Sequence, residues 1–122
     1  MQRDPRAFLW DVRESALAIQ AFTQGMDAAG YAANAMVQAA VERKFEIMGE
    51  ALKQLSRIDA ALASQIPQMS QIIAFRNQLI HGYAKVNTLT VWGVVQTSLP
   101  ELLACVRSLL TEAGEAGEAG EG

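Results

Sequence analysis

The stretch NAMVQAAVERKFEIMGEALKQLSRI, residues 34–58, decides the fold. Apolar residues recur through it at steps of three and four, which is the spacing of one face of an α-helix. The main apolar line consists of Val37, Val41, Phe45, Met48, Leu52 and Leu55. A second line consists of Ala40, Ile47 and Ala51. A helix with two apolar lines has neighbours on two sides, so we expect residues 34–58 to form a central helix of a bundle.

Two shorter apolar repeats predict further helices. Asp4 followed by Pro5 is typical of a helix start, because the acid can accept from backbone N–H groups and proline fits the first turn. The inward residues of this helix are expected to be Phe8, Val12, Ala16, Ile19 and Phe22. Another helix is expected over residues 70–81, with its inward side chains at Ile72, Phe75 and Leu79. Gly82 is expected to end it, because glycine enters the left-handed region at little cost.

The last helix is expected to begin after Asn87, whose side chain can cap it. Its apolar line consists of Trp92, Val95, Leu99, Leu102, Val106 and Leu109. Pro100 interrupts that line, and a proline removes a backbone donor and bends a helix about one turn before itself. Because the apolar line continues in phase beyond Pro100, we expect one bent helix. The predicted fold class is all-α, an antiparallel four-helix bundle with a kinked last helix.

Composition supports one helical domain over residues 1–111. Hydrophobic residues make up 51% of the 122-residue chain, which argues against a disordered protein. No uninterrupted apolar stretch reaches the roughly 18 residues typical of a membrane span, so no membrane contact is expected. Residues 112–122, EAGEAGEAGEG, repeat glycine, glutamate and alanine and offer nothing apolar to bury. We expect this segment to be a disordered tail.

The cysteine count and the net charge indicate the cellular compartment and limit the kinds of binding partner. Cys105 is the single cysteine and can form no disulfide within the chain, so a reducing cytoplasm is expected. The formal net charge is −3, but four glutamates lie in the tail, and residues 1–111 contain nine acidic and ten basic residues. A strongly basic nucleic-acid-binding platform is therefore excluded, whereas a local RNA contact near Arg76 and Lys85 is not.

The stretch FRNQLIHGYAKVN, residues 75–87, contains the only histidine of the chain. On a regular helix His81 would point about 140° away from Arg76 and align with Asn77 one turn earlier. If the helix ends at Gly82, Tyr83 is free to swing back toward His81. One interpretation is a buried histidine, with the tyrosine and arginine paired to carbonyls at the helix end. Four polar side chains within eight residues of an apolar segment favour a functional site instead.

The residue types suit cleavage of a phosphodiester bond. The planar fork of an arginine matches phosphate oxygens, and histidine transfers protons near neutral pH. Together they suit attack by a ribose 2′-hydroxyl, in which one group removes a proton and another protonates the leaving oxygen. No metal-ligand set is visible in the sequence, so a metal-independent route without a cofactor is the economical expectation. A symmetric dimer would supply two histidines to one cleft.

At these residues the sequence resembles the HepT-like toxins of the HEPN superfamily. Residues 76–83, RNQLIHGY, match their R-x4-H-x-Y signature. Residues 40–56, AVERKFEIMGEALKQLS, resemble the second helix of the family. Residues 86–106, VNTLTVWGVVQTSLPELLACV, resemble the fourth. The resemblance covers roughly residues 5–110 and departs from the family at Met69, where a tryptophan is expected soon after the proline.

The resemblance implies that the protein is the toxin of a type VII-like HEPN/MNT toxin–antitoxin pair. Such a toxin is a metal-independent endoribonuclease that acts as a homodimer. Its implied substrate is RNA, such as tRNA or mRNA, and not DNA. The resemblance implies that Arg76 holds the scissile phosphate and that His81 transfers protons. It further implies that Asn77 orients either His81 or the phosphate. It also implies an MNT-type nucleotidyltransferase antitoxin that inactivates the toxin by AMPylation of Tyr83. A bulky phosphate-bearing group beside Arg76 would then block the site.

Glu50 and Gly49 are expected to support the site, and two alternative functions stay open. Glu50 is a supporting candidate that could equally be a solvated acid or a partner for Arg76, and Gly49 is expected to allow close helix approach. The first alternative is a non-catalytic HEPN module that binds a nucleotide or the partner enzyme. The second is a structural bundle in which Arg76 and His81 only cap a helix end.

Overall fold

The structure is a computed structural model that describes residues 3–82 and 86–121, with side chains described as far as residue 114. Every regular element in this part of the chain is a helix. The long helices are α1 (Pro5–Thr23), α3 (Ala35–Ile58), α5 (Met69–His81), α6 (Thr88–Gln96) and α7 (Ser98–Glu121). The short helices are α2 (Ala28–Ala32), which the sequence pattern did not predict, and α4 (Ala60–Ala63). The predicted all-α fold class is confirmed.

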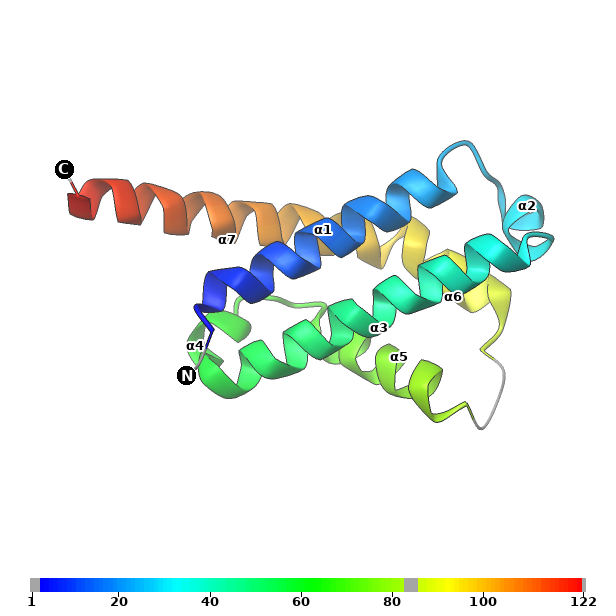
Figure 1. The fold of residues 1–122 in the computed structure, drawn as a ribbon, viewed down its shortest axis with the longest axis horizontal. Coiled ribbons are helices and arrows are strands. Elements are labelled where there is room, and N and C mark those ends of the chain that lie inside the picture. Colours follow the sequence, from blue (N-terminus) through cyan, green and yellow to red (C-terminus); the bar gives the residue numbers. More distant parts are fainter. Residues whose placement is uncertain (1–2, 83–85, 122) are drawn as a thin grey trace.

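Helices α1, α3 and α5 run in alternating directions, and α6 and α7 together run back along the bundle (Figure 1). Helix α3 packs against α1 on one side and against α5 on the other, while α7 packs against α1. The inward side chains of α3 are fully buried at Val41, Phe45, Met48, Leu52 and Leu55, as its main apolar line predicts. Phe22 is an exception to the prediction, because its side chain is 39% exposed near the end of α1. The two apolar sides of α3 therefore place it at the centre of the bundle.

Local side-chain and backbone chemistry sets the helix boundaries. The Asp4 carboxylate accepts from the backbone N–H of Arg6, and the Asn34 amide oxygen accepts from the N–H of Val37. At the start of α6 the amide oxygen of Asn87 accepts from the backbone N–H of residue 89. Gly82 ends α5 with φ 62°, in the left-handed region that favours glycine. Each of these predicted helix ends is confirmed.

The predicted bend before Pro100 is present as a break between α6 and α7. Thr97 separates the two helices, and its backbone N–H and side-chain hydroxyl both donate to the carbonyl of Gly93, at 3.0 and 2.7 Å. Pro100 lies in the first turn of α7, where a missing N–H disrupts no helical hydrogen bond. The position of the bend agrees with the sequence, but the expected single bent helix is two helices divided at one residue. The reason is that proline cannot donate to the carbonyl of Gln96, which is the last residue of α6.

Helix α7 continues beyond the bundle along the acidic repeat to Glu121 (Figure 1). Each glycine in a helix interior costs about 1 kcal/mol relative to alanine, so the repeat is a poor helix former. The expected disorder of residues 112–122 and the domain limit at residue 111 stay predictions.

The segment Thr88–Gly114 is long and apolar enough to cross a membrane by length and composition. Its inward side chains lie in the core of the bundle at Val91, Val95, Leu99, Leu102 and Val106. A core helix of a bundle passes the same test, so this segment is weak evidence for a membrane span.

Candidate active site

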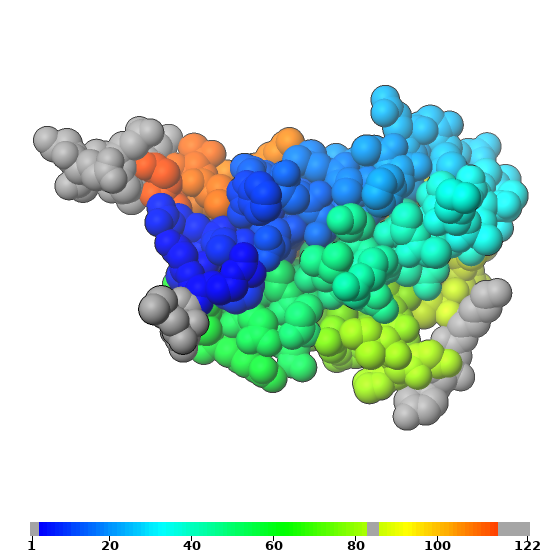
Figure 2. Space-filling model, in the orientation of Figure 1, coloured from blue at the N-terminus to red at the C-terminus, as the bar shows by residue number. Residues whose placement is uncertain are grey.

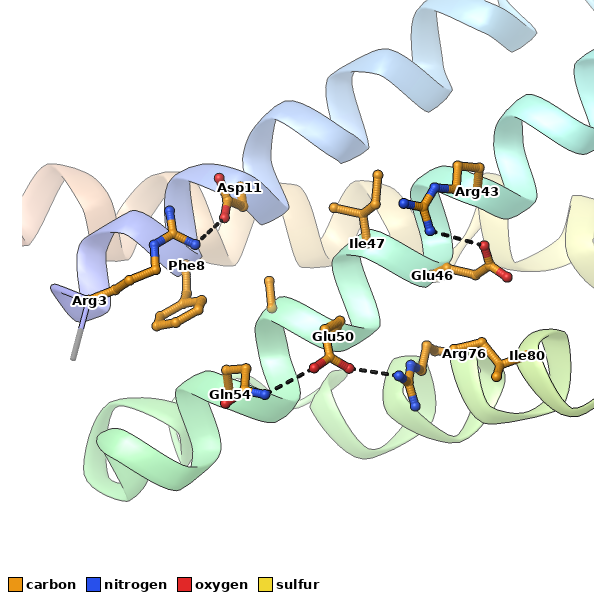
Figure 3. A pocket seen from close by; sticks show the side chains of 11 residues that line it. Arg3, Phe8, Asp11, Arg43, Glu46, Ile47, Glu50, Gln54, Arg76 and Ile80 are labelled. Atoms are coloured by element: carbon orange, nitrogen blue, oxygen red, sulfur yellow. Dashed lines mark hydrogen bonds and ion pairs between the residues drawn. The ribbon is translucent and has the colours of Figure 1, made fainter. Parts of the chain in front are cut away.

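A pocket of about 300 Å³ lies between α1, α3 and α5 (Figure 3). Apolar side chains from all three helices line it, including Phe8, Ile47 and Ile80. The carboxylate of Glu50 on α3 and the guanidinium of Arg76 on α5 also line it. The side chains of these helices lie next to one another on the face shown in Figure 2, with α1 in blue, α3 in cyan to green and α5 in yellow-green. The pocket is thus a mixed apolar and charged site that contains the arginine of the RNQLIHGY motif.

Arg76 is held by hydrogen bonds at both terminal nitrogens. Its Nη2 donates to Oε2 of Glu50 at 2.7 Å, and its Nη1 donates to Oδ1 of Asn77 at 2.9 Å. The Nε atom is buried and makes no hydrogen bond to the described part of the chain. The arginine side chain is 19% exposed, so it lies at the pocket wall with limited contact to water. The structure therefore brings three of the predicted site residues together.

Glu50 is held in turn by Gln54, one helical turn later on α3. The side-chain amide of Gln54 donates to Oε1 of Glu50 at 2.9 Å, while the other carboxylate oxygen faces Arg76 (Figure 3). The hydrogen bond from Gln54, together with the charges of Arg76, Lys53 and Arg57, lowers the pKa of Glu50 despite its partial desolvation. Glu50 is therefore an ionised partner of Arg76.

Gly49 allows this contact because α3 and α5 approach closely at its position. A Cβ atom placed on Gly49 would lie 2.7 Å from Cγ of Arg76 and closer still to its Cβ. Carbon atoms in proteins pack at about 3.5–4.0 Å, so a side chain here would collide with Arg76. The expectation that Gly49 permits close helix approach is confirmed.

His81 does not line this pocket. It is the last residue of α5, its side chain is exposed, and it is absent from the pocket wall. On the regular helix that carries both residues it points about 140° away from Arg76. Among the described residues, the pocket that contains Arg76 therefore does not include His81. Tyr83 and Lys85 lie outside the described residues, so the expected return of Tyr83 toward His81 stays a prediction.

Sequence reasoning missed Gln54 and two further ion pairs at the pocket. Arg3 pairs with Asp11 at 2.7 Å, and Arg43 pairs with Glu46 at 3.5 Å (Figure 3). The i, i+4 spacing of Glu50 and Gln54 was a readable signal, because residues four apart are neighbours on a helix. The pocket contact of Arg3 had no such signal, since it depends on how α1 packs on α3. In the described part of the chain, no group of three or more His, Cys, Asp or Glu side chains could hold a metal ion.

The fold and the site define a small helical-bundle protein with an arginine-centred pocket. The family model described as "Ribonuclease HepT-like" matches residues 12–109, a range that includes Glu50, Arg76 and His81. The chain therefore belongs to the HepT-like ribonuclease family, as the motif resemblance indicated.

Curated relatives agree with this assignment. The chain is 32% identical over 101 residues to "Putative RNase MJ1380" of Methanocaldococcus jannaschii, a match that covers 83% of this chain and 92% of the relative. It is 30% identical over 102 residues to "Probable ribonuclease HepT" of Thermococcus cleftensis, which covers 84% and 92% of the two chains. No solved structure matches the chain at comparable significance.

Proposed function

We propose that the protein is a metal-independent endoribonuclease toxin in which Arg76 and His81 carry out the cleavage of RNA. Membership of the HepT-like ribonuclease family supports the reaction class. The observation that carries the proposal is the guanidinium of Arg76, held at a pocket wall by Glu50 and Asn77. An arginine fixed in this way can bind a phosphate and stabilise the charge that develops on it during transfer.

In the proposed reaction the ribose 2′-hydroxyl attacks the adjacent phosphorus. One imidazole removes the hydroxyl proton, and a second imidazole donates a proton to the 5′-oxygen as the phosphorus–oxygen bond breaks. The products are a 2′,3′-cyclic phosphate and a free 5′-hydroxyl. Arg76 contributes positive charge to the phosphate oxygens throughout. His81 serves as the base in one chain and as the acid in the other.

Such a reaction needs two chains. His81 and Arg76 diverge on α5, and each chain has one histidine. In a homodimer with twofold symmetry, the C-terminal ends of two α5 helices would place two arginines and two histidines around one cleft. The homodimer is thus part of the proposal.

The proposal includes regulation by a partner. An MNT-type nucleotidyltransferase antitoxin would transfer AMP from ATP to the hydroxyl of Tyr83, with release of pyrophosphate. The added phosphate and its nucleoside would lie two residues from His81 and block access to the cleft. A cytoplasmic location follows from the RNA substrate and the ATP-dependent partner.

The test is cleavage of total cellular RNA by purified protein in the presence of EDTA. Wild-type protein is expected to cut RNA, and Arg76→Ala and His81→Ala are each expected to be inactive, while Arg107→Ala on the exposed side of α7 serves as the control. When wild type is refolded with an excess of His81→Ala, the activity per wild-type chain is expected to fall, because a mixed dimer has one imidazole where the proposed reaction uses two. Equal cleavage by wild type and His81→Ala would refute the mechanism.

The second function is a non-catalytic module that binds a nucleotide or the partner enzyme. The observation that favours it is the ion pair between Arg76 and Glu50, which leaves the guanidinium fewer donors for a phosphate. It predicts that wild-type protein binds the partner and cuts no RNA.

The proposed modification of Tyr83 has its own test. Intact-mass measurement after incubation with the partner and ATP is expected to show one added AMP or more on wild type and none on Tyr83→Phe.

A further inference from the structure

We infer that Glu50 is a positioning residue for Arg76, and that Gln54 supports it by fixing the carboxylate. This inference rests on the proposed function, because it concerns how the arginine is aimed at a phosphodiester. Neither residue is required to touch the RNA. Their role is to hold the guanidinium plane in one orientation at the pocket wall.

A continuous chain of hydrogen bonds supports the inference. It runs from Gln54 to Glu50 at 2.9 Å, from Arg76 to Glu50 at 2.7 Å and from Arg76 to Asn77 at 2.9 Å. The chain crosses from α3 to α5, and it holds the guanidinium by both of its Nη atoms. A planar group held at two corners cannot turn about its long axis without breaking a hydrogen bond. Glu50 is the member that joins the two helices.

The donors that remain define what the arginine can bind. A guanidinium has five N–H donors, one on Nε and two on each Nη. One donor on each Nη is used by Asn77 or Glu50, and the Nε atom is buried. One N–H on each Nη therefore remains as a donor for the oxygens of a phosphate.

The alternative is that Glu50 is a latch that occupies the place of the phosphate. The second oxygen of Glu50 accepts from Gln54, so a departing carboxylate would lose two hydrogen bonds, whereas the remaining Nη donors can bind a phosphate while Glu50 stays. The two roles predict opposite effects of removing the carboxylate. A positioning residue is needed for a fast chemical step, while removal of a latch increases activity.

The experiment compares steady-state kinetics of full-length wild type, Glu50→Gln and Gln54→Ala on one defined RNA. For Glu50→Gln we expect kcat to fall about tenfold, because a mispositioned charge stabilises the transition state less well, with KM within about twofold of wild type. Gln54→Ala is expected to lower kcat in the same direction by a smaller factor. The matched control is Glu14→Gln on α1, since Glu14 also pairs with an arginine, at 3.4 Å, and is 46% exposed against 44% for Glu50. An unchanged or higher kcat for Glu50→Gln would overturn the inference.

A second measurement separates this inference from the proposed function. In nitrogen-15 spectra of the arginine side chains, a guanidinium held at both Nη atoms gives separate, slowly exchanging Nη signals. Arg76 is expected to show them in wild type and to lose them in Glu50→Ala, while Glu14→Gln keeps them. If wild type cuts no RNA the proposed function fails, and these spectra still decide whether Glu50 positions Arg76. Separate Nη signals that persist in Glu50→Ala would refute the positioning role.

Discussion

Arg76 and Glu50 lie 26 residues apart in the sequence, and their side chains meet at 2.7 Å across the interface of α3 and α5. The arginine is the more buried partner, at 19% exposed against 44%. Water therefore reaches the carboxylate more easily than the guanidinium. The pair links helix packing to the pocket, because Gly49 beside Glu50 sets how closely Arg76 can approach.

We expect Gly49→Ala to destabilise the protein by about 1–3 kcal/mol, the usual effect of an extra methyl group in a tightly packed contact. The new Cβ would collide with the side-chain stem of Arg76 and push the two helices apart. Urea denaturation measures the change. Gly93→Ala on the exposed side of α6 is the control, because nothing lies within 4 Å of its Cβ position, and there we expect a gain of about 0.5–1 kcal/mol. Equal stability of Gly49→Ala and wild type would show that the helices can separate at little cost.

Arg76→Lys is expected to be nearly as inactive on RNA as Arg76→Ala. A lysine keeps the charge but lacks the planar fork that bonds Glu50 and Asn77 at the same time and still has N–H donors left for a phosphate. Activity of the lysine variant within about tenfold of wild type would mean that charge alone suffices at this position, since each factor of ten is about 1.4 kcal/mol of the barrier. Thermal unfolding is the control for folding of both variants.

Tyr31 is expected to make the protein sensitive to alkaline pH. Its side chain is fully buried against Trp92, and desolvation, with a smaller effect of the Glu42 charge, raises its pKa to about 12 from an ordinary value of 10.0. The folded state holds this proton more tightly than the unfolded state. The contribution of protonated Tyr31 to the free energy of unfolding is therefore fully present below pH 10, and it is lost as the pH rises toward about 12.

Tyr31→Phe removes this dependence and keeps the ring. Its hydroxyl makes no hydrogen bond to the described residues, so the stability of the variant at neutral pH is expected to lie within about 1 kcal/mol of wild type. Free energies of unfolding at pH 8 and pH 11 measure both effects. A wild type and variant that lose stability in parallel would contradict the prediction.

Glu50 is expected to contribute to stability at neutral pH and less in acid. The hydrogen bond from Gln54 and the nearby positive charges lower its pKa below the ordinary value of 4.5 in the folded protein. Its contribution is therefore present above pH 4.5 and disappears as the pH falls through the lowered pKa. The difference in unfolding free energy between wild type and Glu50→Gln should shrink over that range. A difference that is constant between pH 7 and pH 3 would mean that the charge of Glu50 does not stabilise the fold.

The sequence predicted those parts of the fold that depend on neighbouring residues. Asn34, Gly82 and Asn87 act at helix ends through hydrogen bonds and backbone angles within a few residues of themselves, so their types were informative. The short helix α2 was missed because five residues are too few to show a helical period. The inward position of Phe22 was predicted from spacing alone, but its side chain is 39% exposed, one residue before the end of α1.

The candidate site could be predicted only in part, because some of its contacts join helices that are distant in the sequence. Arg76, Asn77 and His81 stand out in the sequence as a motif on one helix. The choice of Glu50 as the partner of Arg76 depends on the packing of α3 against α5, so the sequence left it open between a solvated acid and an ion-pair partner. The divergence of His81 from Arg76 follows from helix geometry and was predicted. The position of Tyr83 lies outside the described residues and stays a prediction.

The two ends of the described chain differ as sites for attaching a label. Arg3 lies at the pocket and packs over the Phe8 ring, so a purification tag or fluorophore joined in front of it would crowd the opening. Helix α7 carries the other end away from the bundle (Figure 1), which makes it the natural attachment point for a tether, a dye or an affinity resin.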